Sequence, residues 1–156
     1  MPAEAQGAYR LFTDGGARGN PGPAGLGAVL VAPDGSVLRE VARGIGWATN
    51  NVAEYQGLIE GLLIAQAFSV DELNVFMDSR LVVEQMRGNF KVKHPGLKPL
   101  HEKARELAAS FKRIRFHAIP RSQNVHADRL TNRGIDEWVA ENPGFGPPDQ
   151  EQPGLF

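Results

Sequence analysis

The segment PDG at residues 33–35 separates two apolar stretches and constrains the fold more than any other feature of the sequence. A turn of this kind is a strong β-hairpin signal, so residues 25–32 and 36–44 are predicted to pair as antiparallel strands. Residues 8–14 form a further extended segment, and the glycine- and proline-rich residues 15–23 are expected to be a loop. The chain is therefore predicted to open with a three-strand antiparallel meander. Glycines in the strand at 25–32 indicate that another segment of backbone approaches it closely.

The apolar residues change their period from two to about 3.6 after residue 50. One face of the resulting amphipathic helix, predicted over residues 51–68, carries Tyr55, Leu58, Ile59, Leu62 and Leu63. The later segments are predicted to form a strand at 72–78, helices at about 80–87 and 97–111, a strand at 114–119 and a helix at 124–141. The predicted fold class is α/β: a mixed five-stranded sheet, with the three-strand meander plus two parallel strands, flanked by helices.

Composition limits the kinds of site that the 156 residues can form. Hydrophobic residues make up 42% and charged residues 22%, which favours one buried core and one domain. The absence of cysteine excludes disulfides, iron–sulfur clusters and cysteine nucleophiles, and the 4 histidines form no H-x-x-x-H pair for zinc. A net charge of −1 excludes a protein that binds nucleic acid by positive charge alone, but not one that binds it through cations.

The sequence contains no segment long and apolar enough to span a membrane, and its N-terminus lacks the apolar stretch of a signal peptide. We therefore expect a cytoplasmic protein, without a membrane partner, that is a monomer. Residues 1–141 are predicted to form the folded domain. Residues 142–156 are rich in proline and glycine and are predicted to form an irregular tail.

Four acidic residues stand at the ends of predicted strands or the beginnings of predicted helices. Asp14 and Asp78 end two strands, where α/β sheets usually place ligand sites, whereas Glu54 and Asp128 lie in the first turns of two helices. Each acid has a structural alternative. Glu54 could form a capping box with Asn51, and Asp78 could cap the helix that follows it. Asp14 could accept hydrogen bonds from nearby amides, and Asp128 could interact with a helix dipole.

Four carboxylates at one edge of a sheet would repel one another unless protons or cations neutralised them. Oxygen-rich sites of this kind suit Mg²⁺ or Mn²⁺, which also bind water and phosphate oxygens. Two such ions about 3.5–4 Å apart can activate a water molecule and stabilise the leaving oxygen of a phosphodiester. The pattern indicates metal-dependent phosphodiester hydrolysis, provided that the topology brings the acids together.

Four blocks of sequence carry a resemblance to a known family. They are TDGGARGNPGPAGLGAVL, TNNVAEYQGLIEGL, MDSRLVVEQM and RSQNVHADRLTN, in this order along the chain. Together they strongly resemble type 1 ribonuclease H. The resemblance implies a ribonuclease H-like fold, a catalytic domain over residues 1–141, and endonucleolytic cleavage of the RNA strand of RNA–DNA hybrids. It further implies a two-metal-ion mechanism that gives 5′-phosphate and 3′-hydroxyl ends, with both ions bound in the presence of substrate. The implied metal ligands are Asp14, Glu54, Asp78 and Asp128.

The same resemblance implies a set of substrate-binding residues. Asn20, Asn50 and Asn51 match positions that read the 2′-hydroxyls of the RNA strand, although turn and helix-cap roles would explain them too. Thr49 and Ser79 resemble hydroxyl donors to a phosphate of the DNA strand. The remaining implied substrate contacts are Gly15, Gly16 and Asn124. A nucleotide-binding P-loop is excluded, because its Gly-Lys-Ser/Thr sequence at the start of a helix is missing. The segment from Arg18 to Pro21 instead resembles the family's substrate-side loop.

Two departures from the family pattern stand out. Many bacterial relatives carry a lysine- and tryptophan-rich helical protrusion after the fourth strand, whereas here the segment RGNFKVKHPGLKPL is short. The chain therefore resembles the protrusion-lacking subgroup found in archaea and some bacteria. Arg121 stands where other members use a histidine to assist water or product release, and a catalytic role for Arg121 is expected. His126 aligns poorly with that role.

Two alternative functions and one partner are also compatible with features of the sequence. A resolvase- or integrase-like DNA nuclease on the same fold is disfavoured by the TNN-x-x-E block, and a non-catalytic hybrid-binding module is the second alternative. The last five residues resemble a pentapeptide with which bacterial replication proteins bind the sliding clamp. They would use Gln152, Leu155 and Phe156 to do so, the alternative being that the two apolar residues fold back on the surface of the domain itself.

Overall fold

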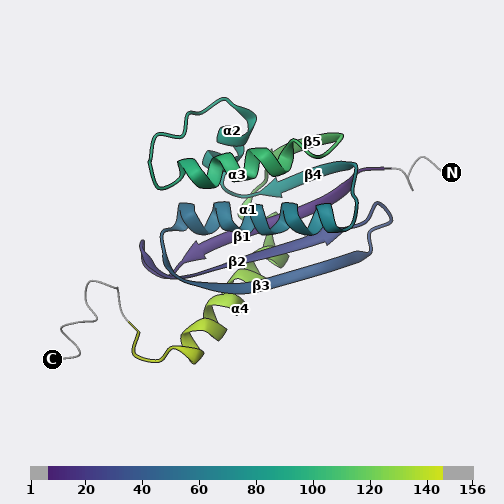
Figure 1. Ribbon diagram of the computed structural model, residues 1–156. Coiled ribbons are helices and arrows are strands. Elements are labelled where there is room, and N and C mark those ends of the chain that lie inside the picture. The colour runs from purple at the N-terminus through teal and green to yellow at the C-terminus, as the bar shows by residue number, and fades with distance from the viewer. Residues whose placement is uncertain (1–6, 146–156) are drawn as a thin grey trace.

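A computed structural model describes residues 7–145 as a five-stranded sheet with the strand order β3-β2-β1-β4-β5 (Figure 1). Strands β1 (Tyr9–Ala17), β2 (Gly22–Val31) and β3 (Val37–Ala48) form an antiparallel meander. Strands β4 (Glu72–Met77) and β5 (Arg113–Ala118) run parallel to β1. The predicted meander, its hairpin turn and the two parallel strands are therefore confirmed.

The helices lie on both faces of the sheet (Figure 1). On one face, α1 (Asn50–Ala67) packs against β1 and β2, and α2 (Arg80–Arg87) and α3 (Lys98–Ala108) lie beside it. On the other face, α4 (Val125–Glu141) crosses β2 and β3, preceded by the short 3-10 helix η2 (Arg121–Gln123), which was not predicted. Between residues 7 and 145, no helix combines the length and the apolarity that crossing a bilayer requires.

The main core lies between the sheet and the helices α1 and α3. Apolar residues of α1, β1 and β4 are fully buried there, including Leu11, Leu58, Leu62 and Val75. Leu63 was expected on the same face of α1 but is 41% exposed, because the helix turns it away from the sheet. Burial of each large aliphatic side chain contributes about 1.5–3 kcal/mol to folding, so this core fixes α1 relative to β1 and β4.

The glycine-rich segment after Asp14 was predicted as a loop, and this prediction is wrong. Gly15 and Gly16 continue β1 and pair with β2, so the loop is confined to residues 18–21. The physical reason is the approach of α1: a Cβ atom at Gly15 would lie 2.1 Å from the carbonyl oxygen of Ala53. Glycine here permits close packing of a strand on a helix rather than a turn. Strand β3 likewise continues past the predicted end at residue 44.

Two glycines of β2 allow α4 to approach the opposite face, as predicted. A Cβ atom at Gly27 would lie 2.4 Å from the carbonyl oxygen of Ala127, and one at Gly25 would lie 2.8 Å from Ile135 Cγ1. The first turns of α4 can therefore lie directly on the sheet beside the end of β1. This contact places the beginning of α4 next to Asp14, which matters for the site described below.

Candidate active site

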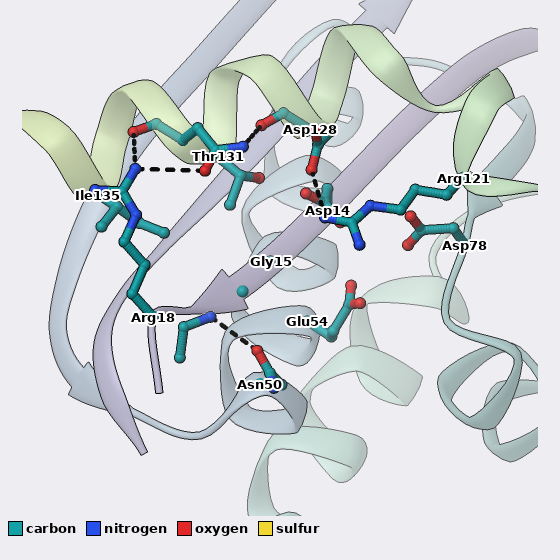
Figure 2. Close-up of a pocket in the computed structure, with 13 residues that line it drawn as sticks. Asp14, Gly15, Arg18, Asn50, Glu54, Asp78, Arg121, Asp128, Thr131 and Ile135 are labelled. Carbon is teal, nitrogen blue, oxygen red and sulfur yellow. Dashed lines mark hydrogen bonds and ion pairs between the residues drawn. The ribbon is translucent and has the colours of Figure 1, made fainter. Parts of the chain in front are cut away.

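Three carboxylates come together where β1 and β4 reach the edge of the sheet (Figure 2). Asp14 lies within β1, Asp78 directly follows β4, and Glu54 reaches the same place from α1. One oxygen of each carboxylate lies within 4.8 Å of the other two. The sheet topology therefore brings together three of the four acids that the sequence singles out.

The fourth acid, Asp128, borders the same pocket from the first turn of α4. The pocket has a volume of about 580 Å³ and opens to solvent between the end of β1, the beginning of α1 and one side of α4. Asp128 lies outside the tight group of three but close enough for its charge to raise the pKa of Asp14. All four acids thus face one cavity.

Glu54 and Asp78 do not have the capping roles that were considered for them. The side chain of Thr49 caps α1, and that of Ser79 caps α2, each accepting a hydrogen bond from the amide three residues later at 3.2 and 3.3 Å. Glu54 is the fifth residue of α1, so its predicted place in the first turn is also corrected. Because serine and threonine satisfy the helix ends, both acids are left for the pocket.

Burial and mutual repulsion raise the pKa values of the three clustered acids. Burial, followed by the charge of Asp78, raises the pKa of Asp14 to about 7. Burial, followed by the charges of Asp14 and Asp78, holds the pKa of Glu54 well above its usual range. Burial also raises the pKa of Asp78, and the positive charge of Arg121 partly opposes this shift. Ionised acids in this pocket are destabilised unless a cation accompanies them.

The donor atoms fit a divalent cation. Glu54 Oε1 is buried and has no hydrogen-bond partner among the described residues, which is costly for a carboxylate unless another ligand binds it. The clustered donors are all carboxylate oxygens, a set typical of Mg²⁺ and Mn²⁺ rather than of zinc. Asp14, Glu54 and Asp78 can therefore hold a hard divalent cation at this edge of the sheet.

The asparagines expected to contact RNA lie at the entrance of the pocket, on the β1–β2 loop and the beginning of α1. Asn50 borders the pocket, and its side-chain oxygen accepts a hydrogen bond from the amide of Ala17 at 2.8 Å. The side-chain oxygen of Asn20 accepts one from the amide of Asn50 at 2.9 Å. Asn20, Asn50 and Asn51 are all exposed. These bonds hold the loop against α1 and leave the side-chain NH₂ groups for a ligand.

The other residues expected to contact substrate have different surroundings. Gly15 and Gly16 line the pocket, and Thr49 and Ser79 are half-buried. Asn124 is only 1% exposed, and its amide donates to the carbonyl oxygen of Thr13 at 2.9 Å. The side chain of Asn124 thus joins the beginning of α4 to β1, and its contact with substrate stays a prediction.

Arg121 extends from η2 over the rim of the pocket, with 79% of its side chain exposed (Figure 2). Its Nη2 atom lies 3.5 Å from Asp128 Oδ1. His126 instead pairs with Glu40 of β3, which agrees with its poor alignment to the family histidine. Arg18, which the resemblance places in a substrate-side loop without giving it an individual role, also lines the pocket. Its place between Asp14 and Asn20 in the first family block was a signal that could have identified it.

Two features expected from the sequence concern other parts of the chain. Residues 88–97, which connect α2 to α3, contain no helix, in agreement with the predicted lack of a protrusion. The residues proposed for clamp binding, Gln152, Leu155 and Phe156, lie outside the described residues, as does most of the predicted tail.

Comparisons with known proteins agree with this geometry. A family described as "Reverse transcriptase-like" matches residues 12–134. A Mycobacterium tuberculosis protein described as bifunctional is 56% identical over 127 residues, covering 81% of this chain but 35% of the Mycobacterium protein. A ribonuclease H of Pseudomonas fluorescens is 35% identical over 150 residues, covering 86% of this chain and 95% of the relative.

Solved structures show the same arrangement of strands and helices. The structure of LC11-RNase H1 in complex with RNA/DNA hybrid superposes with a TM-score of 0.80 at 45% sequence identity, covering 84% of this chain and 99% of that one. The RNase H1 of the halophilic archaeon Halobacterium salinarum gives a TM-score of 0.81 at 40% identity, with 84% and 99% covered. The likeness therefore extends over nearly all of both solved chains.

Proposed function

This chain belongs to the ribonuclease H family, and we propose that it is an endonuclease that hydrolyses the RNA strand of RNA–DNA hybrids. The observation that carries the proposal is the group of three carboxylates, Asp14, Glu54 and Asp78, in a solvent-open pocket with one buried oxygen left unpartnered. A relative solved with RNA/DNA hybrid at 45% identity supports the same substrate. We assign the activity to residues 1–141.

The pocket would hold Mg²⁺ or Mn²⁺ through its carboxylates. Asp14 is central, since it faces Glu54 and Asp78 on one side and Asp128 on the other (Figure 2). The chemistry supplied when two ions are bound with substrate is activation of a water and stabilisation of the leaving 3′-oxygen, which gives 5′-phosphate and 3′-hydroxyl ends. The protein contributes the fixed positions of the acids, because β1, β4 and α1 are held together by the main core.

Residues around the acids would orient the hybrid. Asn20 and Asn51 have exposed side chains that can donate hydrogen bonds to 2′-hydroxyls, which only the RNA strand carries. The hydroxyls of Thr49 and Ser79 accept from helix amides and can still donate to a phosphate oxygen of the DNA strand. The guanidinium of Arg121, at the rim, can stabilise charge that develops on the departing phosphate.

The test is digestion of matched RNA–DNA, DNA–DNA and RNA–RNA duplexes with Mg²⁺, Mn²⁺ or a chelator. We expect cleavage of the RNA strand of the hybrid alone, with either metal and not with the chelator. End-labelled products should ligate as 5′-phosphate and 3′-hydroxyl ends. Cleavage of DNA–DNA would favour a DNA nuclease, and binding of the hybrid without cleavage would favour a non-catalytic module.

A further inference from the structure

Arg18 is, with Arg121, one of two positively charged side chains that line the acid-lined pocket within residues 7–145. Among the thirteen described residues that line this pocket, only Arg18 and Arg121 carry a positive charge. The two lie on opposite sides of the acids: Figure 2 shows Arg121 beside Asp78, and Arg18 at the other end, next to Ile135. Arg18 belongs to the short loop between β1 and β2, so a backbone turn presents its side chain to the pocket.

The contacts of Arg18 leave it ready for another partner. Its Nη2 atom lies 2.7 Å from Asp136 Oδ1 and 3.4 Å from both the side-chain and the main-chain oxygen of Asn132, all on α4. The side chains of Arg18 and Asp136 are 46% and 65% exposed. Exposed ion pairs contribute little to stability, so this one can be exchanged at small cost. Because all three contacts use Nη2, the donors on Nε and Nη1 are left for a second ligand.

We propose that Arg18 binds a backbone phosphate of the hybrid, and that Asp136 holds its guanidinium beside the pocket until the substrate replaces the carboxylate. The inference rests on the proposed function, because a strand cut at the acids must continue through this pocket and carries a phosphate at every nucleotide. A guanidinium matches a phosphate with two parallel hydrogen bonds, whereas it meets Asp136 through one nitrogen. A chain with a net charge of −1 also needs such local contacts to retain a polyanion.

A purely structural role for the same ion pair makes a different prediction. If the pair only joined the β1–β2 loop to α4, removing either partner would loosen the loop and weaken hybrid binding. If Asp136 competes with the phosphate for Arg18, the two substitutions have opposite effects. Arg18→Ala then weakens binding, and Asp136→Asn strengthens it.

The experiment measures the affinity of the full chain for a short RNA–DNA hybrid with Mg²⁺ at several salt concentrations, in an Asp78→Asn background that prevents cleavage. We expect Arg18→Ala to weaken binding roughly tenfold. It should also reduce the slope of log affinity against log salt by about 0.9, the contribution of one neutralised phosphate. Asp136→Asn should strengthen binding about two- to fivefold, and only while Arg18 is present.

A matched control distinguishes a specific role of Arg18 and Asp136 from a general effect of net charge on binding. Arg133 and Glu137 form a neighbouring exposed ion pair on α4, with 60% and 61% of their side chains exposed, and neither lines the pocket. Arg133→Ala and Glu137→Gln change the charge of the same helix and should shift affinity less than the substitutions at Arg18 and Asp136. Equal shifts in the two pairs would overturn the proposal, as would unchanged binding by Arg18→Ala or weaker binding by Asp136→Asn.

Cleavage by the chain without substitutions separates this inference from the proposed function. If that chain does not cut the hybrid, the proposed function fails, and the binding measurements still decide the role of Arg18. If it cuts the hybrid but Arg18→Ala leaves KM and the salt dependence unchanged, only the role of Arg18 is overturned. The expected result is a higher KM with kcat changed less.

Discussion

Glu54 and Tyr55 are neighbours in α1, yet they belong to two opposite kinds of polar environment. Glu54 faces the acid-lined pocket, where its buried Oε1 has no partner among the described residues and its pKa is raised well above the usual range by burial. Tyr55 is fully buried on the core side, and its hydroxyl donates to Gln85 Oε1 at 2.6 Å. The main-chain carbonyl oxygen of Gln85 lies 3.2 Å from His101 Nε2.

The difference shows how one helix serves both stability and chemistry. Paired polar groups in the core, here called the Tyr55 cluster (Tyr55, Gln85 and His101), connect α1 to α2 and α3 without leaving a buried group unsatisfied. The clustered acids of the pocket destabilise the metal-free fold, because each ionised carboxylate lies near another. The cluster therefore helps to hold Glu54 in a place that repulsion disfavours.

The largest effect is expected from Asp78→Asn, which retains size but removes the charge. Loss of a metal ligand should lower cleavage of the hybrid by at least about 10²–10³-fold. The same substitution should raise the stability of the metal-free protein by roughly 1 kcal/mol, since it relieves repulsion in the pocket. Steady-state kinetics and urea unfolding check the two parts.

A suitable control is Asp34→Asn in the β2–β3 turn. Asp34 accepts hydrogen bonds from Ser36, which lower its pKa, so this acid is stabilised by its neighbours rather than strained. The control should leave cleavage unchanged. Activity of Asp78→Asn within about tenfold of the unsubstituted chain would rule out its role as a metal ligand.

The next effect is a dependence of stability on pH in the presence of a chelator. The pKa of Asp14 is raised to about 7 in the folded state, so between pH 4 and 7 the folded protein binds more protons than the unfolded chain. Stability should therefore fall by about 1–4 kcal/mol as the pH rises from 5 to 8. Urea unfolding at these pH values should show the decrease, and Asp14→Asn should reduce it.

Adding Mg²⁺ tests the same acids in the opposite direction, because the ion should stabilise the fold where their repulsion destabilises it. A cation that binds only the folded state stabilises it, by about 2.7 kcal/mol at a hundredfold excess over Kd. The stabilisation should be large at pH 8, where the acids are ionised, and small at pH 5, where protons compete. Equal stabilisation by Mg²⁺ at both pH values would show that the ion binds elsewhere.

The sequence was sufficient to predict the order and type of the main strands and helices. The hairpin signal at residues 33–35 and the change of apolar period after residue 50 are local properties, and both give the correct elements. The continuation of β1 through Gly15 and Gly16 could not be read in this way. Glycine is rare in strands, and at Gly15 it is required because α1 approaches the sheet.

The site was predictable in its acids and less so in their surroundings. Asp14 lies in β1 and Asp78 directly follows the neighbouring parallel strand β4, a relation that follows from topology once the strands are assigned. The contact of Arg18 with Asp136 joins residues that are far apart in sequence and has no local pattern. The burial of Asn124 is similarly a tertiary effect, because asparagine is usually exposed and only the docking of α4 covers it.

A smaller effect is expected when the Tyr55 cluster loses one hydrogen bond. Tyr55→Phe retains the ring but leaves Gln85 Oε1 buried without its donor, at a cost of about 1–3 kcal/mol in unfolding free energy. Cleavage at 25 °C should change little, because the acids keep their places. The chain has one other tyrosine, Tyr9, which is half-buried, and Tyr9→Phe is the matched control. Equal unfolding free energies for the two variants would show that the cluster does not stabilise the helices.

The smallest effect is expected from a substitution of Arg121, which lies at the rim of the acid-lined pocket. Arg121 is 79% exposed, and its charge lowers the pKa values of Glu54 and Asp78. Arg121→Ala should therefore lower kcat about three- to tenfold near neutral pH while changing KM less. Because the acids become harder to ionise without this charge, the loss should be greater at pH 6 than at pH 9. Arg121→Lys, which retains the charge, should recover part of the rate. If Arg121→Ala instead raises KM alone, equally at both pH values and with unchanged single-turnover rates, then Arg121 only contacts the backbone of the hybrid.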